Sequence, residues 1–526
     1  MHRRHFLRAT PPLFATPWLA SCSKGPAVAV QPAPPPQPRL GINLAEVVDW
    51  NTELPFLDMF RSSREWISQK PNAEWAKGPP LELDAQGWIK QLEPGHWADT
   101  PMGSTSTGLH PAGIYRVSYQ GQGELDFWAG ATVQSRAAGQ LVIEVTPSKG
   151  PIWLRLKATN STDPVRDIRV WRPGVDPATA TPNAFDPAFL KRWQGVACVR
   201  FMDWMHTNNS KQSGWKNRPL PSEARFSVKG VAVEVMVDLV NQLGADAWFC
   251  MPHLADDDYV RQFASLVAAQ LKPGLKAYVE FSNELWNGQF EQAREAQTAA
   301  KAAGLGLAGW VAQRSLHMFS LWEAAMGGRE RLVRVMPAQA ANAWYSEELL
   351  KHQEAFKRSD VLAIAPYLSL NVPPDNTGGG KGPVAAEVEA WGLEKLFEYL
   401  ERQALPECMA WMKNQKLVAD KFGVKLVAYE GGQHVMGMRG AENNERLTQL
   451  LLAANADARM GQLYERFFDA WAVAGGDLHC HFNSVSQWSK WGSWGLLQHA
   501  AEDASKSPKY QAAMNWAKKQ GQKVSA

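Results

Sequence analysis

The chain is poor in cysteine: its 526 residues include five, and no two of them form a CxxC pair or a zinc-binding spacing. We therefore expect no metal ion and no cofactor. Cys198 and Cys250 fall on segments predicted to be neighbouring strands, so they either form a disulfide or, as we prefer, serve as small buried hydrophobes. The chain also lacks a large excess of positive or negative charge, since 55 basic and 52 acidic residues leave a net charge of +3. We expect no nucleic acid as a partner.

Long apolar runs are also absent. No stretch approaches the roughly 20 apolar residues that a membrane-spanning helix needs. Pro12 and Pro17 interrupt the modest apolar segment near the N-terminus. We expect a soluble, monomeric protein that touches a membrane only through an N-terminal anchor.

That anchor is predicted from the first 22 residues, which we interpret as an export signal. Arg3 and Arg4 begin a stretch that resembles the twin-arginine motif, and residues 19–22, Leu-Ala-Ser-Cys, resemble a bacterial lipobox. Cleavage there would make Cys22 the lipidated first residue, in the periplasm or at the outer membrane. An ordinary signal peptide with a chance cysteine is the alternative. Residues 23–38, rich in proline and alanine, predict an extended linker.

What the chain has in excess is tryptophan, with 24 residues. Tryptophan rings stack on sugar rings, so the excess favours a carbohydrate-binding protein, although tryptophan also fills protein cores. A cluster of these rings near strand ends is more informative than scattered ones.

Two apolar segments each end in a glutamate. Residues 276–281 are rich in β-formers and predict a buried strand, which delivers Asn283 and Glu284 just beyond its end. Residues 424–429 predict a second such strand, followed by Glu430 and two glycines. Barrel enzymes hold their catalytic groups at the C-terminal ends of strands. Two strand-end glutamates roughly 150 residues apart suggest the paired carboxylates of glycoside hydrolysis.

The same residues carry a family resemblance, to the clan A glycoside hydrolases. It lies in Asn283-Glu284, in Trp286-Asn287 and in Tyr429-Glu430-Gly431. Members of that clan are (β/α)8 barrels with an acid/base glutamate after an asparagine at the end of strand 4 and a nucleophilic glutamate at the end of strand 7. The resemblance covers roughly residues 39–60 and 185–500 and singles out no one family. Two glutamates that cap helices or pair with arginine are the alternative.

The rest of the chain predicts an α/β architecture that matches. Apolar runs alternate with helical periodicity along residues 39–60 and 185–510, which we interpret as a (β/α)8 TIM barrel. Residues 61–184 instead contain short period-two runs separated by turns, typical of an all-β, sandwich-like domain inserted after strand 1. Because both ends of this insert join adjacent strands, we expect it to dock over the C-terminal face of the barrel. Its tryptophans would touch substrate there or fill its own core, and they include Trp128, Trp153 and Trp171.

Further residues are expected around the two carboxylates. The resemblance assigns Asn283 to the sugar 2-hydroxyl and likens His253 to a histidine beside the reacting sugar. Arg200 and Tyr367 are candidate hydrogen-bond donors that keep Glu430 ionised, a part that such residues play in some families of the clan. The other predicted substrate contacts are Asn43 at the mouth of strand 1, Trp286 of the motif, and Trp488 or Trp491 as a stacking floor.

Structural alternatives remain for several of these residues. Arg200 can form an ion pair in the barrel core, His253 can be a hydrogen-bonded loop residue, and Tyr367 can be a packing residue. His479 and His481 alternate on the predicted eighth strand, but no carboxylate at ligand spacing accompanies them, so they do not favour a metal site.

The predicted function is a retaining glycoside hydrolase that cleaves β-glycosidic bonds of a polysaccharide or oligosaccharide by double displacement. Glu284 must hold a proton at working pH, which needs burial or a neighbouring negative charge, whereas Glu430 must stay ionised. An endo-β-1,4-glucanase of the cellulase type is the preferred class. The alternatives are a mannanase, a xylanase or an exo-glycosidase of the same clan, or a non-catalytic glycan-binding lipoprotein on the same barrel.

Overall fold

The computed structural model describes residues 37–105, 108–375 and 382–525. The predicted export signal, with Cys22, and nearly all of the predicted linker lie outside these residues.

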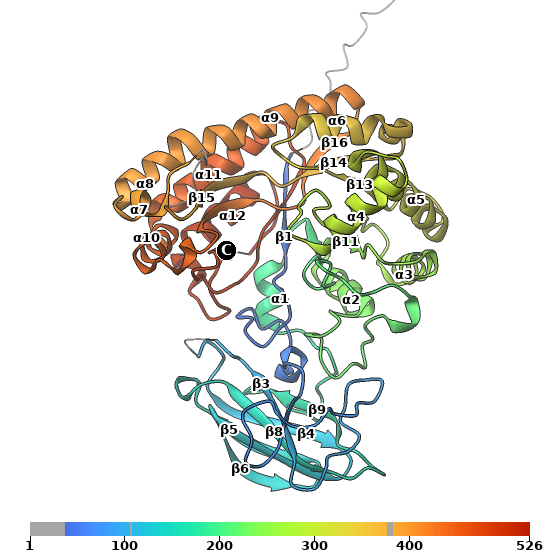
Figure 1. Ribbon diagram of the computed structural model, residues 1–526, viewed down its shortest axis with the longest axis vertical. Helices are drawn as coiled ribbons and strands as arrows, with labels where there is room; N and C mark the ends of the chain where they lie inside the picture. Colours follow the sequence, from blue (N-terminus) through green and yellow to red (C-terminus); the bar gives the residue numbers. More distant parts are fainter. Residues whose placement is uncertain (1–36, 106–107, 376–381, 526) are drawn as a thin grey trace, which may run out of the picture. The chain divides into compact units, whose positions relative to one another are not determined.

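Eight parallel strands close into a barrel, in the order β1, β10, β11, β12, β13, β14, β16 and β18 (Figure 1). Their bounds are Arg39–Asn43 (β1), Cys198–Arg200 (β10), Asp246–Met251 (β11), Ala277–Phe281 (β12), Leu332–Pro337 (β13), Val361–Ile364 (β14), Lys425–Ala428 (β16) and Leu478–His481 (β18). Nearly every residue of these strands is buried, as expected when helices cover the outside and side chains fill the inside. The predicted barrel is confirmed.

Helices follow the strands and surround the barrel (Figure 1). They are α1 (Pro187–Trp193), α2 (Val233–Leu243), α3 (Asp257–Gln270), α4 (Glu291–Ala302), α5 (Leu307–Met326), α6 (Ala343–Lys351), α7 (Ala385–Glu389), α8 (Leu393–Tyr399), α9 (Leu405–Phe422), α10 (Glu445–Ala456), α11 (Ala458–Val473) and α12 (Pro508–Lys519). Their starts follow ordinary capping rules: at α3, for example, the Asp256 carboxylate accepts a hydrogen bond from the backbone N–H of Tyr259.

A short parallel pair extends the barrel next to two of its strands, and the sequence did not predict it. β15 (Tyr367–Val372) follows β14, and β17 (Gly432–Gly437) follows β16. Tyr367 lies opposite Gly432 in this pair. The pairing therefore holds Tyr367 next to the chain that carries Glu430.

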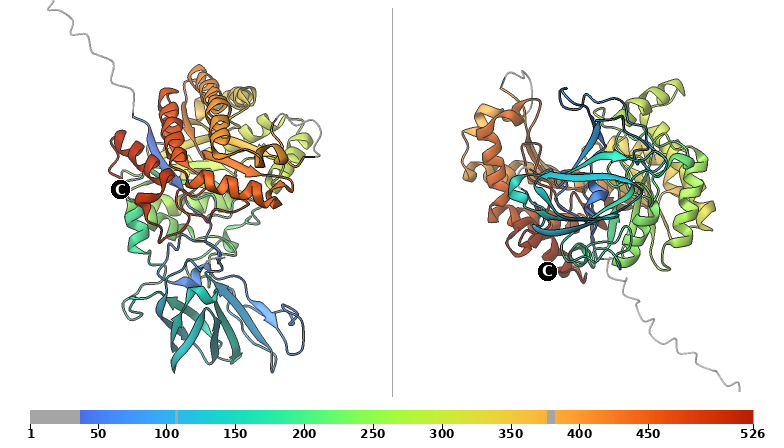
Figure 2. Two further views of the ribbon diagram at one scale, coloured as in Figure 1. Left: turned by 90° about the vertical axis from the view of Figure 1, so that its left-hand side faces the viewer. Right: turned by 90° about the horizontal axis from the view of Figure 1, so that it is seen from below.

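The inserted segment forms two four-stranded antiparallel sheets, of order β2-β3-β8-β5 and β6-β7-β4-β9. Their bounds are Ile67–Gln69 (β2), Trp97–Met102 (β3), Gly113–Gln120 (β4), Gly123–Ala129 (β5), Ala131–Ala137 (β6), Gln140–Val145 (β7), Ile152–Thr159 (β8) and Arg166–Trp171 (β9). Side chains from both sheets share one apolar core, which includes Tyr115, Val117, Phe127 and Leu154. Figure 2 shows the two sheets face to face. The predicted fold class, a barrel with an additional all-β part, is confirmed.

The insert contacts the connection between β10 and α2. The carbonyl of Arg61 accepts a hydrogen bond from the N–H of Phe226 at 2.8 Å, and that of Gln86 accepts one from Ala224 at 2.8 Å. The Arg61 guanidinium also donates to the carbonyl of Glu223. Because this connection leaves the C-terminal end of β10, the contacts lie on the barrel face where we expected the insert.

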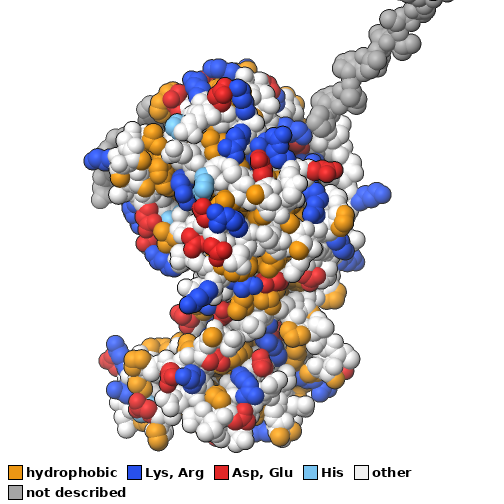
Figure 3. All heavy atoms as spheres, turned by 90° about the vertical axis from the view of Figure 1, so that its right-hand side faces the viewer, with side chains coloured by type: hydrophobic (Ala, Val, Ile, Leu, Met, Phe, Trp, Pro, Cys, Tyr) orange, Lys and Arg blue, Asp and Glu red, His pale blue; other side chains and the backbone are white. Residues whose placement is uncertain are grey.

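Figure 3 shows charged side chains of both signs intermingled on the face that it draws. No helix in the described part of the chain is long and apolar enough to cross a membrane. Within the same residues no group of three or more His, Cys, Asp or Glu is placed to hold a metal ion. Cys198, Cys250, Cys408 and Cys480 are buried and free, so the first two pack as small hydrophobes and form no disulfide.

Candidate active site

Glu284 is held by a distorted turn directly after β12. Ser282 and Glu284 both have left-handed backbone angles, with φ of 61° and 45°. Residues other than glycine pay roughly 1–3 kcal/mol for such a conformation, and it tends to persist at functional sites. The N–H of Asn287 closes the turn on the Glu284 carbonyl at 2.8 Å. The turn fixes where the Glu284 carboxyl lies relative to the barrel.

Glu430 follows β16, and the two glycines after it are required by the histidines of β18. A Cβ atom at Gly431 would lie 2.6 Å from Nε2 of His479. At Gly432, where φ is 135°, a Cβ would lie 2.5 Å from the His481 ring. His479 and His481 are themselves fully buried, and their rings contact the aromatic rings of α11. These histidines therefore shape the turn that presents Glu430.

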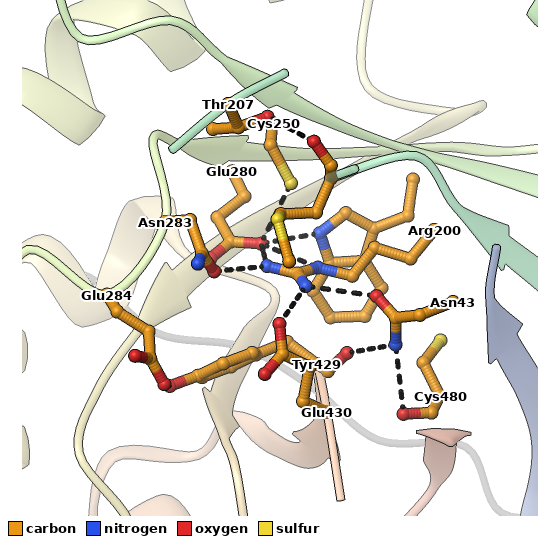
Figure 4. Close-up of polar contacts among 12 residues, drawn as sticks. Asn43, Arg200, Thr207, Cys250, Glu280, Asn283, Glu284, Tyr429, Glu430 and Cys480 are labelled. Atoms are coloured by element: carbon orange, nitrogen blue, oxygen red, sulfur yellow. Dashed lines mark hydrogen bonds and ion pairs between the residues drawn. The ribbon is translucent and has the colours of Figure 1, made fainter. Parts of the chain in front are cut away.

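Arg200 of β10 is the hub of the site (Figure 4). Its Nη1 donates to Oε1 of Glu430 at 2.8 Å. Its Nε and Nη2 donate to Oε2 of Glu280 at 3.1 and 2.9 Å. The side-chain oxygens of Asn43 and Asn283 accept the other two bonds, at 3.1 and 2.8 Å. Arg200 is fully buried, so its positive charge acts on Glu430 with little screening by water.

The two strand-end carboxyls have opposite electrostatic settings. Burial and the charge of Glu430 raise the pKa of Glu284 to about 8, and its hydrogen-bond donors are the neutral side chains of Asn287, at 2.9 Å, and Tyr429, at 3.4 Å. Burial also raises the pKa of Glu430, but Arg200 and the Tyr367 hydroxyl, which donates to Oε2 at 2.9 Å, pull that pKa down. Near neutral pH the pair is thus suited to one proton, on Glu284.

Four predicted site residues meet in this network, beside the two glutamates. Arg200 and Tyr367 contact Glu430 as expected. Asn283 uses its oxygen on Arg200 and its amide N–H on Asn208, at 3.1 Å. Asn43 likewise accepts from Arg200, and it donates to the carbonyl of Tyr429 at 2.9 Å. Asn43 therefore links Arg200 of β10 to the end of β16 and helps to fix the position of the Arg200 side chain.

The other predicted residues make their contacts elsewhere. The His253 ring lies 3.1 Å from Glu295 of α4. Trp488 is 7% exposed and donates its N–H to the carbonyl of Gly495. Trp286 is half-buried and packs against the main core. Trp491, at 57% exposure, lies open to solvent. None of these four has a described hydrogen bond, ion pair or ring contact with either carboxyl.

Sequence reasoning missed Glu280, the second carboxylate on Arg200. Glu280 lies within β12 and is fully buried, and its Oε2 also accepts from the indole N–H of Trp248 at 2.8 Å. A glutamate in the middle of an apolar strand is the signal that could have found it, because buried carboxylates are almost always paired. Glu280 balances the charge of Arg200 and fixes its orientation toward Glu430.

Two further features near Glu430 were also missed. Burial and the charges of Glu46 and Glu430 raise the pKa of Asp203, which follows β10, to about 8. An Asp carboxyl that is neutral near pH 7 can donate a hydrogen bond as well as accept one. The Trp494 ring packs against the His434 ring, and the His434 ring packs against that of Tyr367. The ring centroids are 5.8 Å apart in both pairs. Trp494, half-buried, is thus linked to the site more directly than Trp488 or Trp491.

No protein-family model matches the chain, and no curated protein matches its sequence. Solved structures that align with part of this chain include the GH51 arabinofuranosidase from Xanthomonas axonopodis pv. citri, at 13% identity and a TM-score of 0.38 over 66% of this chain and 69% of that one. A GH5 lichenase from Caldicellulosiruptor sp. F32 aligns at 14% identity and 0.36, over 66% and 89%. A modular endo-β-1,4-mannanase from Cellulomonas fimi aligns at 13% and 0.31, over 58% and 62%. All three are glycoside hydrolases by description.

Proposed function

We propose that the protein is a retaining glycoside hydrolase that cleaves β-glycosidic bonds. One observation carries the proposal: two carboxyls at the ends of β12 and β16 have environments that separate their protonation states. Burial raises the pKa of Glu430, but its partners Arg200 and Tyr367 lower that pKa. Glu284 has only neutral hydrogen-bond donors, and burial and the charge of Glu430 raise its pKa to about 8. A pair of titratable groups whose environments push their pKa values apart is the arrangement that acid/base and nucleophilic roles require.

The proposed reaction has two displacements. In the first, Glu430 attacks the anomeric carbon, the bond to the leaving oxygen breaks, and Glu284 gives its proton to that oxygen. In the second, Glu284, now a carboxylate, takes a proton from water, and the resulting hydroxide displaces Glu430 from the sugar. Arg200 and the Tyr367 hydroxyl stabilise Glu430 as the attacking and later as the leaving carboxylate.

The substrate we propose is a β-linked polysaccharide or a fragment of one. Trp494 and the exposed Trp491 are the tryptophans of the segment after β18 that are not buried, so their rings can stack on sugars. A cellulase-type endo-β-1,4-glucanase is the preferred class, but His253, on which that preference partly depends, contacts Glu295. The choice among glucan, mannan, xylan and galactan is therefore left to experiment.

The test is a panel of these four polysaccharides, with release of reducing ends as the readout. We expect release from at least one of them, and none with Glu430→Ala. Azide is a small external nucleophile that takes the place of a lost carboxylate, so it should restore turnover of an activated aryl glycoside in Glu430→Ala. As a matched control, Glu295→Ala changes an acidic residue of α4 outside the network and should keep full activity. Binding without release from any polysaccharide would instead favour a non-catalytic glycan-binding protein.

We also propose that the protein is exported and held at a membrane through a lipid on Cys22. The support is the sequence pattern of the first 22 residues. A lipid anchor with an extended linker would hold the enzyme where polymeric substrates outside the cytoplasm can reach it.

A further inference from the structure

Three tryptophans gather on the outer face of the β2-β3-β8-β5 sheet of the insert. Trp128 of β5 stacks on Trp153 of β8, with ring centroids 5.0 Å apart and planes 19° from parallel. Trp75, from the connection between β2 and β3, packs edge-on against both rings. Its ring centroid lies 6.4 Å from that of Trp128 and 5.3 Å from that of Trp153. Trp75 is 50% exposed and Trp128 37%. We call Trp75, Trp128 and Trp153 the tryptophan platform.

The platform is held in place by an ion pair between buried Asp99 and partly exposed Arg155. Asp99 of β3 is fully buried and accepts two hydrogen bonds from Arg155, at 2.8 and 3.0 Å. The same carboxylate accepts the indole N–H groups of Trp128 at 3.4 Å and Trp97 at 3.1 Å. The Arg155 guanidinium lies over both of these rings, at 5.7 and 4.9 Å from their centroids. Rings held in this way lose little freedom when a ligand stacks on them.

The other tryptophan that we expected to take part, Trp171, is buried and offers no exposed ring. Trp171 of β9 is 3% exposed and donates its N–H to Ser118 at 3.1 Å. The outer face of the second sheet offers a comparison, because it is largely polar: Arg116 and Glu144 are exposed there, and Gln134 donates to Glu144 at 2.9 Å. The aromatic face is therefore specific to one sheet, and an exposed aromatic patch of this kind marks a binding surface.

The charges around the platform identify the kind of ligand. Arg155 is paired with Asp99, Arg136 with Asp126 at 2.7 Å, and Lys157 with Glu124. The charged side chains of β5 and β8 on this face are thus neutralised in pairs. Glu74 and Lys77, which flank Trp75 in the sequence, carry opposite charges, so neither sign dominates around the platform. A neutral ligand with flat apolar faces and hydroxyl edges fits such a surface, and sugar chains have that character.

We propose that the tryptophan platform binds neutral polysaccharide, as a second site separate from the candidate active site. The choice of polysaccharide as ligand rests in part on the proposed function, but the binding itself needs no catalysis. A second site on the same chain raises the effective concentration of a polymer at the barrel and leaves a short substrate unaffected.

The test is affinity electrophoresis through gels that contain hydroxyethyl cellulose, glucomannan, arabinoxylan or, as an anionic probe, polygalacturonate. The parent carries Glu284→Gln so that the gel is not hydrolysed. We expect at least one neutral polymer to retard the parent, and Trp75→Ala/Trp128→Ala to weaken this binding about tenfold. Ile114→Ala is the control, because Ile114 is 48% exposed on the outer face of the other sheet, and it should bind like the parent.

Each contrary outcome is distinct. Equal retardation of parent and double variant, or retardation by polygalacturonate alone, overturns the proposal, as does parent binding to no neutral polymer. Loss of a parent dimer in the double variant, seen by sedimentation, would overturn it in favour of self-association. Trp75→Ala alone, at a half-exposed position, keeps the test open if the double variant fails to fold. With Glu284 restored in both proteins, the tryptophan double variant should cleave an aryl glycoside at the same rate as the protein that keeps Trp75 and Trp128. If the proposed function is wrong, neither protein will cleave it, whatever the binding result.

Discussion

Replacing Tyr367 with phenylalanine removes one atom from the site, the hydroxyl oxygen that lies 2.9 Å from Glu430 Oε2. Burial and the two glutamates raise the pKa of Tyr367 well above its ordinary value, so this hydroxyl keeps its proton and remains a donor. A hydrogen bond to a charged group contributes about 1.5–3 kcal/mol. Because the bond favours the ionised form of Glu430, its loss raises the pKa of Glu430 by about 1–2 units at 1.36 kcal/mol per unit.

The assay is the pH dependence of kcat/KM with an aryl glycoside. The acid limb of this profile reports the ionisation of Glu430 and should move to higher pH by about 1–2 units in Tyr367→Phe. The basic limb reports loss of the proton from Glu284 and should move much less, since the Tyr367 hydroxyl donates to Glu430. Thermal unfolding of the variant serves as the control for its fold.

An unchanged acid limb together with an unchanged kcat/KM would refute this reasoning. It would mean that Arg200 alone holds the charge of Glu430 and that the Tyr367 hydroxyl contributes nothing to it. A shift of the acid limb to lower pH would contradict the sign of the argument outright.

Three further predictions follow from the site and the N-terminus. Arg200→Met leaves the buried carboxylates of Glu280 and Glu430 unpaired, so it should abolish activity and lower the free energy of unfolding by about 3–5 kcal/mol in denaturant titrations; an active, equally stable variant would contradict the hub role. Burial raises the pKa of Glu284 from 4.5 to about 8, so between these values the folded protein holds a proton that the unfolded chain has released, and stability falls as pH rises. Glu284→Gln should therefore be more stable than the parent at pH 7 and nearly equal to it below pH 4.5, and equal stability at pH 7 would refute the raised pKa. Cys22→Ser should move the protein from the membrane fraction to the soluble fraction of cells, and an unchanged distribution would exclude the lipid anchor.

The barrel was predictable because its signals are local. Most of its strands lie in short, largely apolar runs, and the chain places Glu284 and Glu430 just beyond two of them. The two antiparallel sheets were predictable from period-two runs for the same reason. The pair β15 and β17 was not, because each follows a barrel strand after only a few residues and reads in the sequence as its continuation or as loop.

The hydrogen bonds and ion pairs among the site residues could not be predicted from the sequence. Glu280 and Glu284 are close in the sequence, yet Glu280 pairs with Arg200 and Glu284 bonds to Asn287 and Tyr429. Only the alternation of side chains along β12 puts Glu280 inside the barrel with Arg200. His253 stands at a strand end that suits a site residue, but the ring turns to Glu295, more than 40 residues along the chain. Side-chain direction at strand ends depends on loop conformation, which no local pattern encodes.

The stereochemistry of hydrolysis tests the double displacement most directly. The parent enzyme would be mixed with a β-linked oligosaccharide taken from whichever polysaccharide of the panel it cleaves, and proton NMR would record the anomeric signals before mutarotation. Two displacements at one carbon restore the original configuration, so the β-anomer of the product should appear first and the α-anomer only later. Appearance of the α-anomer first would mean a single displacement by water, and Glu430 would then be a general base that never bonds to the sugar.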